Sequence, residues 1–296
     1  REQFGKNAYF RTRNMTWENV ALEYSKLFSK YSGELAEVSK RKKIPPINLR
    51  HLFRLTDDFG IIQFSQLSLP DIASGYTVDD NARALVVACS CYSGKEKKLL
   101  KRVEIYLRFI ESVSGQNGLF GNYVRSDRTL DNELNRNENL EDANGRTLWA
   151  LAVAATADPL PESLRNKALS LFGKRSENHE MFESPRAAAF YVKGLCLLLK
   201  AKKQIGGNDL NGSLIRHCDR LVSLYRGVSS EEWPWFENYL TYSNAVFPEA
   251  LLLGHQQTGN SEYLEIGTKT LDFLIRQTFI NGIYVPIGQD GWHHKM

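Results

Sequence analysis

Carboxylates recur at the starts of several apolar segments in this 296-residue sequence. Three of them, Asp80, Asp142 and Glu237, belong to separate segments. Cleavage of a glycosidic bond needs one protonated carboxyl group that donates to the leaving oxygen. It also needs one ionised carboxylate that activates water or attacks the sugar. Because like charges and desolvation separate the pKa values of neighbouring acids, one such set can supply both forms. These three residues are therefore the candidate catalytic acids and bases.

The densest aromatic stretch, residues 233–249, reads Trp-Pro-Trp-Phe-Glu-Asn-Tyr-Leu-Thr-Tyr-Ser-Asn-Ala-Val-Phe-Pro-Glu. Its two prolines argue against one continuous helix. Aromatic faces pack on the C–H face of a sugar, while carboxylates and amides bond to its hydroxyl groups. The expected sugar platforms are Tyr76, Trp233, Trp235 and Trp292. The alternative is that these rings fill the core of a helical domain.

Other polar residues occupy equivalent positions near the segment starts. The candidate substrate-binding residues among them are Asp79, Arg83, Glu141, Asn144, Arg146, Glu183, Arg186, Tyr242, Asn244 and Asp290. The acids and amides have a second interpretation, because Asp and Asn cap helices and negative charge is stabilised at a helix N-terminus. The arginines could clamp an anionic ligand, but because they lie one turn into each buried helix we expect them to pair with the neighbouring acids.

A repeated order of elements follows residue 48. A Gly-and-aromatic turn leads into a polar segment and then an apolar helix, with turns at residues 60–64, 118–123, 181–183, 233–236 and 282–286. Partner helices are predicted over residues 99–112, 214–225 and 263–278. Residues 147–157 and 187–200 are apolar nearly all round, which predicts burial between neighbours. Irregular spacing of about 40–60 residues indicates helical hairpins with variable loops. We therefore predict an all-α fold, an (α/α)-type toroid whose inner helix starts converge on one cavity.

Composition excludes several classes of function. The 42% hydrophobic and 24% charged residues are ordinary values for a globular protein. A net charge of +4, without a basic stripe between aromatics, argues against a nucleic-acid partner. No apolar run approaches the ~20 residues of a membrane span. Motifs for nucleotides, GxSxG hydrolases and HExxH metalloproteases are missing, so we expect no cofactor. The pair His293 and His294 lacks a third ligand for a metal.

The four cysteines indicate the cellular compartment in which the protein is expected. Cys89, Cys91, Cys196 and Cys218 lie in apolar surroundings without CxxC spacing. They are interpreted as reduced thiols, which favours a cytoplasmic protein.

The first part of the chain differs from the rest. Residues 14–30 place apolar side chains at helical spacing, which predicts an amphipathic helix that must dock on a partner surface. Residues 39–46, Ser-Lys-Arg-Lys-Lys-Ile-Pro-Pro, indicate a solvated linker rather than a nucleic-acid or membrane patch. Residues 15–28 resemble the last helix of GT-B-fold glycosyltransferases. The expected organisation is a transferase remnant at 1–38, a linker at 39–47 and the toroid at 48–296.

Three motifs carry a second resemblance, which covers residues 48–296. They are Gly-Tyr-Thr-Val-Asp-Asp-Asn-Ala-Arg-Ala-Leu at 75–85, Asn-Leu-Glu-Asp-Ala-Asn-Gly-Arg at 139–146, and residues 233–244. Together they resemble a bacterial domain fused behind GT-B glycosyltransferases and similar to the six-hairpin glycosidase superfamily. The resemblance implies an (α/α)6-type toroid and a link to oligosaccharide metabolism, without a fixed activity. Ser243 departs from the usual Tyr-Asp-Asn pattern, which puts an ionised role there in doubt.

Both ends of the chain look trimmed. It opens on Arg1 without an initiator Met and closes inside an aromatic turn, before a further hairpin that would complete a six-unit ring. We therefore expect an incomplete toroid.

The first hypothesis for function is a glycoside hydrolase-like enzyme that acts with inversion. Acids on different hairpins can sit the ~6.5–9.5 Å apart that admits a water molecule. The alternatives are a non-catalytic carbohydrate-binding module and a helical scaffold for the attached transferase.

Overall fold

The computed structural model describes residues 17–32, 45–115, 118–176, 181–207, 209–280, 282–288 and 292–295, together with Ala8, Thr12 and Met15. The chain forms two compact units, residues 1–48 and residues 49–296. In the first unit, helix α2 (Trp17–Ser32) has the predicted amphipathic pattern. Its large apolar side chains are exposed, Trp17 at 88% and Tyr31 at 80%. Most of the predicted linker lies outside the described residues.

Helical hairpins make up most of the described part of the second unit. They are α4 (Val78–Cys91) with α5 (Lys97–Ser112), α7 (Glu141–Thr156) with α8 (Glu162–Ser176), α9 (Pro185–Lys200) with α10 (Leu210–Val228), and α11 (Val246–Thr258) with α12 (Ser261–Thr278). The predicted helices at 99–112, 214–225 and 263–278 are confirmed. Sequence reasoning missed α8, because its polar side chains obscure the helical period.

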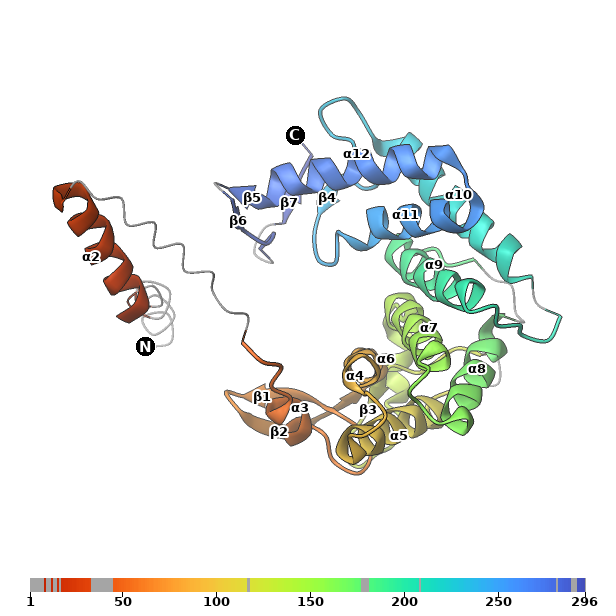
Figure 1. Ribbon diagram of the computed structural model, residues 1–296. Helices are drawn as coiled ribbons and strands as arrows, with labels where there is room; N and C mark the ends of the chain where they lie inside the picture. The colour runs from red at the N-terminus through yellow and green to blue at the C-terminus, as the bar shows by residue number, and fades with distance from the viewer. Residues whose placement is uncertain are drawn as a thin grey trace. The chain divides into compact units, whose positions relative to one another are not determined.

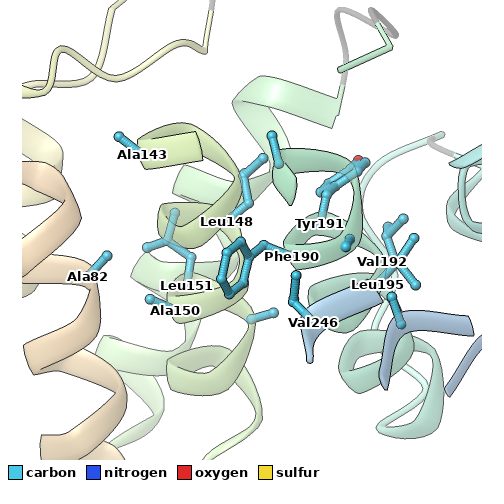
Figure 2. Close-up of a cluster of buried hydrophobic side chains, with 14 of the residues drawn as sticks. Ala82, Ala143, Leu148, Ala150, Leu151, Phe190, Tyr191, Val192, Leu195 and Val246 are labelled. Carbon is cyan, nitrogen blue, oxygen red and sulfur yellow. The ribbon is translucent and has the colours of Figure 1, made fainter. Parts of the chain in front are cut away.

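The first helices of the hairpins form an inner row. Helix α7 packs against α4 and α9, and α9 packs against α11, in chain order (Figure 1). Each inner helix also packs against the second helix of its own hairpin. Figure 2 shows the buried side chains that join the row, with Ala82, Leu148, Phe190, Leu195 and Val246 contributed by successive inner helices. The predicted burial of α7 and α9 is confirmed.

Gly145 permits the closest approach within this row. A Cβ at this position would lie 2.6 Å from both the Cα and the carbonyl oxygen of Ala187. Only glycine allows the backbones of α7 and α9 to approach so closely. The starts of these two helices are therefore held together by their main chains as well as by their side chains.

Short strands accompany the helices, so the all-α prediction is incomplete. β1 (Ile62–Gln66) and β2 (Leu69–Thr77) form an antiparallel hairpin, and β3 (Tyr123–Val124) pairs with β2. β4 (Tyr239–Leu240) pairs with β7 (His293–His294), and β5 (Phe279–Ile280) pairs with β6 (Ile283–Tyr284). The short helices α3 (Arg50–Leu55) and α6 (Asn132–Asn137) complete the described elements. Of these strands, β1, β3 and β6 overlap predicted Gly-and-aromatic turns.

Buried asparagines connect the turns to the inner helices. The Asn81 side chain accepts from Ile61 N at 3.1 Å and donates to Thr77 O. Asn144 bonds to both the N and the O of Phe120, at 2.8 and 3.0 Å. A buried amide that satisfies main-chain groups fixes a turn that has no regular ladder of its own. The turns that contain Ile61 and Phe120 are therefore attached to the starts of α4 and α7.

Candidate functional site

The starts of α4 and α7 are joined by shared charges. Asp79 receives hydrogen bonds from Arg146 Nη1 at 2.9 and 3.0 Å, and from Arg83 Nη2 at 2.6 Å. The Arg146 side chain is only 10% exposed and that of Asp79 is 20% exposed. Two guanidinium groups and one carboxylate satisfy one another well in this geometry. The expected pairing of arginines with the neighbouring acids is confirmed here.

Asp80 sits beside this pair and has its own hydrogen bonds. Its carboxylate accepts from Thr77 Oγ1 at 2.6 Å and from Arg83 at 2.9 Å. The Thr77 hydroxyl in turn accepts from the Asp80 backbone N–H, as the N-cap of α4. Burial raises the pKa of Asp80 above its usual value, although the bonds from Thr77 and Arg83 oppose this. A raised pKa is the property that a proton-donating carboxyl group needs.

The acids at the start of α7 reach across to α9. Glu141 accepts hydrogen bonds from the backbone N–H groups of Glu183, at 2.9 Å, and Ser184. Asp142 accepts from the hydroxyl groups of Ser184 and Tyr242. Asp142 thus has neutral hydroxyl donors, whereas Asp79 and Asp80 bond to arginines. These contacts between α7 and α9 show that the N-termini of the two helices lie on the same side of the row.

Glu237 joins the network through Arg186. Two Arg186 nitrogens lie 2.9 and 2.8 Å from the two carboxylate oxygens, and both side chains are nearly buried, at 6% and 12% exposed. The same guanidinium donates to Thr241 Oγ1 at 2.6 Å and to the carbonyl oxygen of Tyr242 at 3.0 Å. Of the two contacts with Glu237, only that of Nη1 with Oε1 is a hydrogen bond, and the ion pair as a whole fixes both partners in place. The loop before α11 is therefore attached to the start of α9.

Tyr242 lies close to the guanidinium groups of both buried arginines. The guanidinium carbons of Arg146 and Arg186 are 5.6 and 4.9 Å from its ring centre. Burial, together with the bond to Asp142, raises the pKa of Tyr242 to about 12, so the phenol stays a neutral donor at pH 7. The residue as a whole is 48% exposed. Of the predicted substrate-binding rings, Tyr242 is the one that is both in the network and open to solvent.

The prediction of Tyr76, Trp233 and Trp235 as sugar platforms is wrong. They are 3%, 6% and 0% exposed, so their faces are covered by protein. Trp235 packs edge-on against Phe236 and Phe247 in the core. The core-filling interpretation of these rings is therefore the correct one, because they leave no free face for a ligand.

One of these rings, Trp233, still serves the site indirectly. The Trp233 Nε1–H donates to the carbonyl oxygen of Glu237 at 2.7 Å and so holds the loop that carries this acid. Tyr76 donates to Asp57 at 2.6 Å, outside the acid network. Trp292 is half-buried and immediately precedes β7, the strand paired with β4. Asp290 lies outside the described residues.

Asn144 and Asn244 are structural rather than ligand-binding residues. They are 2% and 8% exposed. The Asn244 amide bonds to the N and O of Thr241, at 3.0 and 2.8 Å. Because these amides are occupied by main-chain groups, their predicted contact with a substrate is wrong. The Glu183 residue is exposed, and its backbone rather than its carboxylate joins the network.

Sequence reasoning missed the hydroxyl groups that hold the acids. Thr77, Ser184 and Thr241 each bond to a charged side chain of the network. A partial signal was available, because Thr77 and Ser184 stand at N-cap positions where hydroxyl residues are preferred. Thr241 had no such signal, since it pairs with a residue of another hairpin.

Two pockets among the described residues border the network, and another lies away from it. One of about 340 Å³ is lined by Tyr242 and Ser243 with the end of α12, and one of about 300 Å³ by Glu141 and Phe182. A third, of about 400 Å³, lies beside Tyr76. Volumes of this size suit a small ligand. Ser243 has a left-handed backbone, with φ of 50°, in the wall of the first pocket.

Other site classes have less support. Within the described ranges, no His, Cys, Asp or Glu side chains gather in a group of three that could hold a metal ion. His293 instead stacks on Trp233, with ring centres 5.5 Å apart. None of the helices described here is long and apolar enough to span a membrane.

No protein-family model matches the chain, and no curated protein sequence matches it.

Proposed function

We propose that residues 48–296 form a carbohydrate-active domain that acts on neutral oligosaccharides in the manner of a glycoside hydrolase. One observation carries the proposal. Asp79, Asp80, Asp142 and Glu237 belong to one network at the helix starts, in which Asp142 bonds to the half-exposed Tyr242 and the other acids are linked through arginines. Carboxylates with an adjoining aromatic ring supply both the hydrogen bonds and the stacking surface that a sugar needs.

In the enzyme hypothesis, Asp80 is the general acid, because its pKa is raised by burial. Asp142 is the base that activates water, since its direct partners are the hydroxyl groups of Ser184 and Tyr242. Glu237 is held by Arg186 and contributes negative charge near the developing positive charge of the sugar. Inversion remains the expected outcome for acids that come from separate hairpins.

A neutral ligand is favoured over a phosphorylated one. Arg83, Arg146 and Arg186 are each paired with a carboxylate of the network. The carboxylates at the helix starts outnumber these three guanidinium groups: they are Asp79, Asp80, Glu141, Asp142 and Glu237. An added phosphate would meet excess negative charge, and the arginines would first have to leave their partners. Hydrolysis is accordingly favoured over phosphorolysis.

A non-catalytic carbohydrate-binding module is the second candidate. The specific observation in its favour is that Asp79, Asp80 and Glu237 are all held by arginines, which limits their freedom to exchange protons. A scaffold that docks a transferase is the third.

Further proposals rest on the sequence resemblance. We propose that the hairpins belong to an (α/α)6-type toroid and that α2 closes a GT-B glycosyltransferase domain in the same polypeptide. The row of parallel inner helices supports the first, and the amphipathic pattern of α2 supports the second. A cytoplasmic location is proposed because all four cysteines are free thiols.

The test is a binding and turnover screen with the purified chain and a panel of neutral and phosphorylated oligosaccharides. Calorimetry measures binding, and chromatography of the products measures cleavage. Asp142→Asn is compared with Asp158→Asn, a control at a carboxylate that is 97% exposed. Lost cleavage with retained binding in Asp142→Asn alone supports the enzyme. Binding without cleavage by the unmodified protein supports the module, and no binding at all rejects both.

A further inference from the structure

A second charged pair lies on the inner helices, away from their starts. Lys193 of α9 is 9% exposed, and its Nζ lies 2.8 Å from Oε2 of Glu249 in α11. The same ammonium group lies 4.1 Å from the ring centre of Trp149 in α7. Three neighbouring helices thus meet at one nearly buried cation. None of these residues belongs to the carboxylate network described above.

Aromatic contacts connect this pair to that network. The Arg146 guanidinium carbon is 5.0 Å from the ring centre of Phe190, and Phe190 stacks on Trp149 with centres 5.7 Å apart. On α9, Arg186, Phe190 and Lys193 follow at intervals of four and three residues. That spacing places them on one helix face. The charged pair therefore continues the face that carries the network.

The distance along the helix is significant for the size of a ligand. Seven residues separate Arg186 from Lys193, which is about 10 Å along a helix axis. A single pyranose ring is shorter than this. A sugar bound at the helix starts would have to extend by a further ring to reach Lys193.

The burial of Lys193 needs a reason beyond stability. Most of α9 is apolar and buried, and Val192 and Leu195 lie next to this lysine in the core. Replacement of a buried ion pair by apolar residues of similar volume is often neutral or stabilising. The Glu249 side chain is 49% exposed, so one side of the pair reaches the surface. A charged pair at such an edge is suited to contact with a ligand.

We propose that Trp149, Lys193 and Glu249 form a second sugar subsite, so that the ligand is a neutral oligosaccharide of at least two rings. This inference rests on the proposed function. Lys193 donates N–H groups to hydroxyls and Glu249 accepts from them, while the half-buried Trp149 holds the Lys193 ammonium group in place over its ring. The pair is neutral as a unit, which suits an uncharged sugar.

The experiment compares a monosaccharide with an oligosaccharide of the same sugar, each titrated calorimetrically into the whole chain. The variant is Lys193→Met/Glu249→Gln, which removes both charges at similar volume. We expect the Kd of the oligosaccharide to rise about tenfold, the effect of one or two lost hydrogen bonds. The Kd of the monosaccharide should stay the same. Arg226→Met/Glu262→Gln, at an exposed ion pair between α10 and α12, is the matched control and should change neither.

Unchanged oligosaccharide affinity in the variant overturns the subsite, and so does an equal loss for both ligands. If the double variant fails to fold, Glu249→Gln alone, at a half-exposed side chain, takes its place with the same expectations. If the unmodified protein binds no sugar, the proposed function fails as a whole. That result differs from the one that overturns only the subsite, in which the unmodified protein and the variant bind the oligosaccharide with the same Kd.

Discussion

The ring of Tyr242 lies on the guanidinium group of Arg186, whose carbon is 4.9 Å from the ring centre. Arg186 also donates to the carbonyl oxygen of Tyr242 at 3.0 Å, so side chain and main chain are held together. These contacts bring a loop residue from the fourth hairpin onto the start of the third. The aromatic part of the candidate site therefore depends on one buried arginine.

Loss of that arginine should be costly. Arg186→Met leaves Glu237 nearly buried without its cation, which we expect to destabilise the protein by about 3–5 kcal/mol. Urea denaturation measures the change. Adding Glu237→Gln should recover part of it, because the uncompensated charge is gone. Arg226→Met, at an exposed pair, should cost only about 0–1 kcal/mol. A double variant less stable than the single one would contradict this account.

The contact between α7 and α9 gives a second prediction. Gly145→Ala places a Cβ against the backbone of Ala187, and we expect a loss of about 1–3 kcal/mol in the free energy of unfolding. Gly227→Ala, within α10, meets no atom within 4 Å and should be stabilising by up to about 1 kcal/mol. Thermal melts of the two variants make the comparison. Equal melting temperatures for the two variants would contradict the close contact between the backbones of α7 and α9.

The raised pKa of Asp80 predicts how stability changes with pH. A carboxyl group whose pKa is higher in the folded than in the unfolded protein favours folding below its unfolded pKa. This contribution is lost as the pH rises through the folded pKa. The usual pKa of an Asp side chain is about 4. As the pH rises from about 4 to about 7, the Asp80→Asn variant should therefore become more stable relative to the unmodified protein. Urea midpoints across this range provide the measurement, and a gain that shrinks with pH would refute the assignment.

Tyrosine ionisation tests the bond between Tyr242 and Asp142. The Tyr242 pKa of about 12 is raised first by burial and then by this carboxylate. Asp142→Asn should lower it towards the ordinary value of about 10, so tyrosinate absorbance should rise at lower pH. Stability due to the neutral phenol is complete below about pH 10 and is lost as the pH rises towards 12. Asp158→Asn is the control, and identical titration curves would disprove the bond.

The starts of α4 and α9 were predictable because each combines a hydroxyl cap residue, Thr77 or Ser184, with an apolar run. Arg83, Arg146 and Arg186 could be assigned to the acids for the same reason, since they follow them by a few residues or begin the next helix. The burial of Trp233 and Trp235 was not predictable. A tryptophan beside a proline has the same composition in a core as in a binding site, and only packing against Phe273 distinguishes them.

The Lys193–Glu249 pair was also beyond sequence reasoning. Its partners are 56 residues apart and lie on helices whose rotation about their axes is set by packing. The strands β1 and β2 were missed because their turn signal is weak: Leu67, rather than glycine, adopts the left-handed turn conformation, with φ of 55°. Local patterns therefore predicted which segments are helices, but not which of their side chains would meet.

The buried amides of Asn81 and Asn144 have a consequence for how the chain acquires its structure. Each bonds to a turn that lies 20 to 24 residues upstream, within its own repeat. Short loops close at a lower entropic cost than long ones, so each hairpin can assemble before its neighbours dock. Hydrogen exchange should accordingly release protection in blocks, one hairpin at a time, as in other arrays built from adjacent modules.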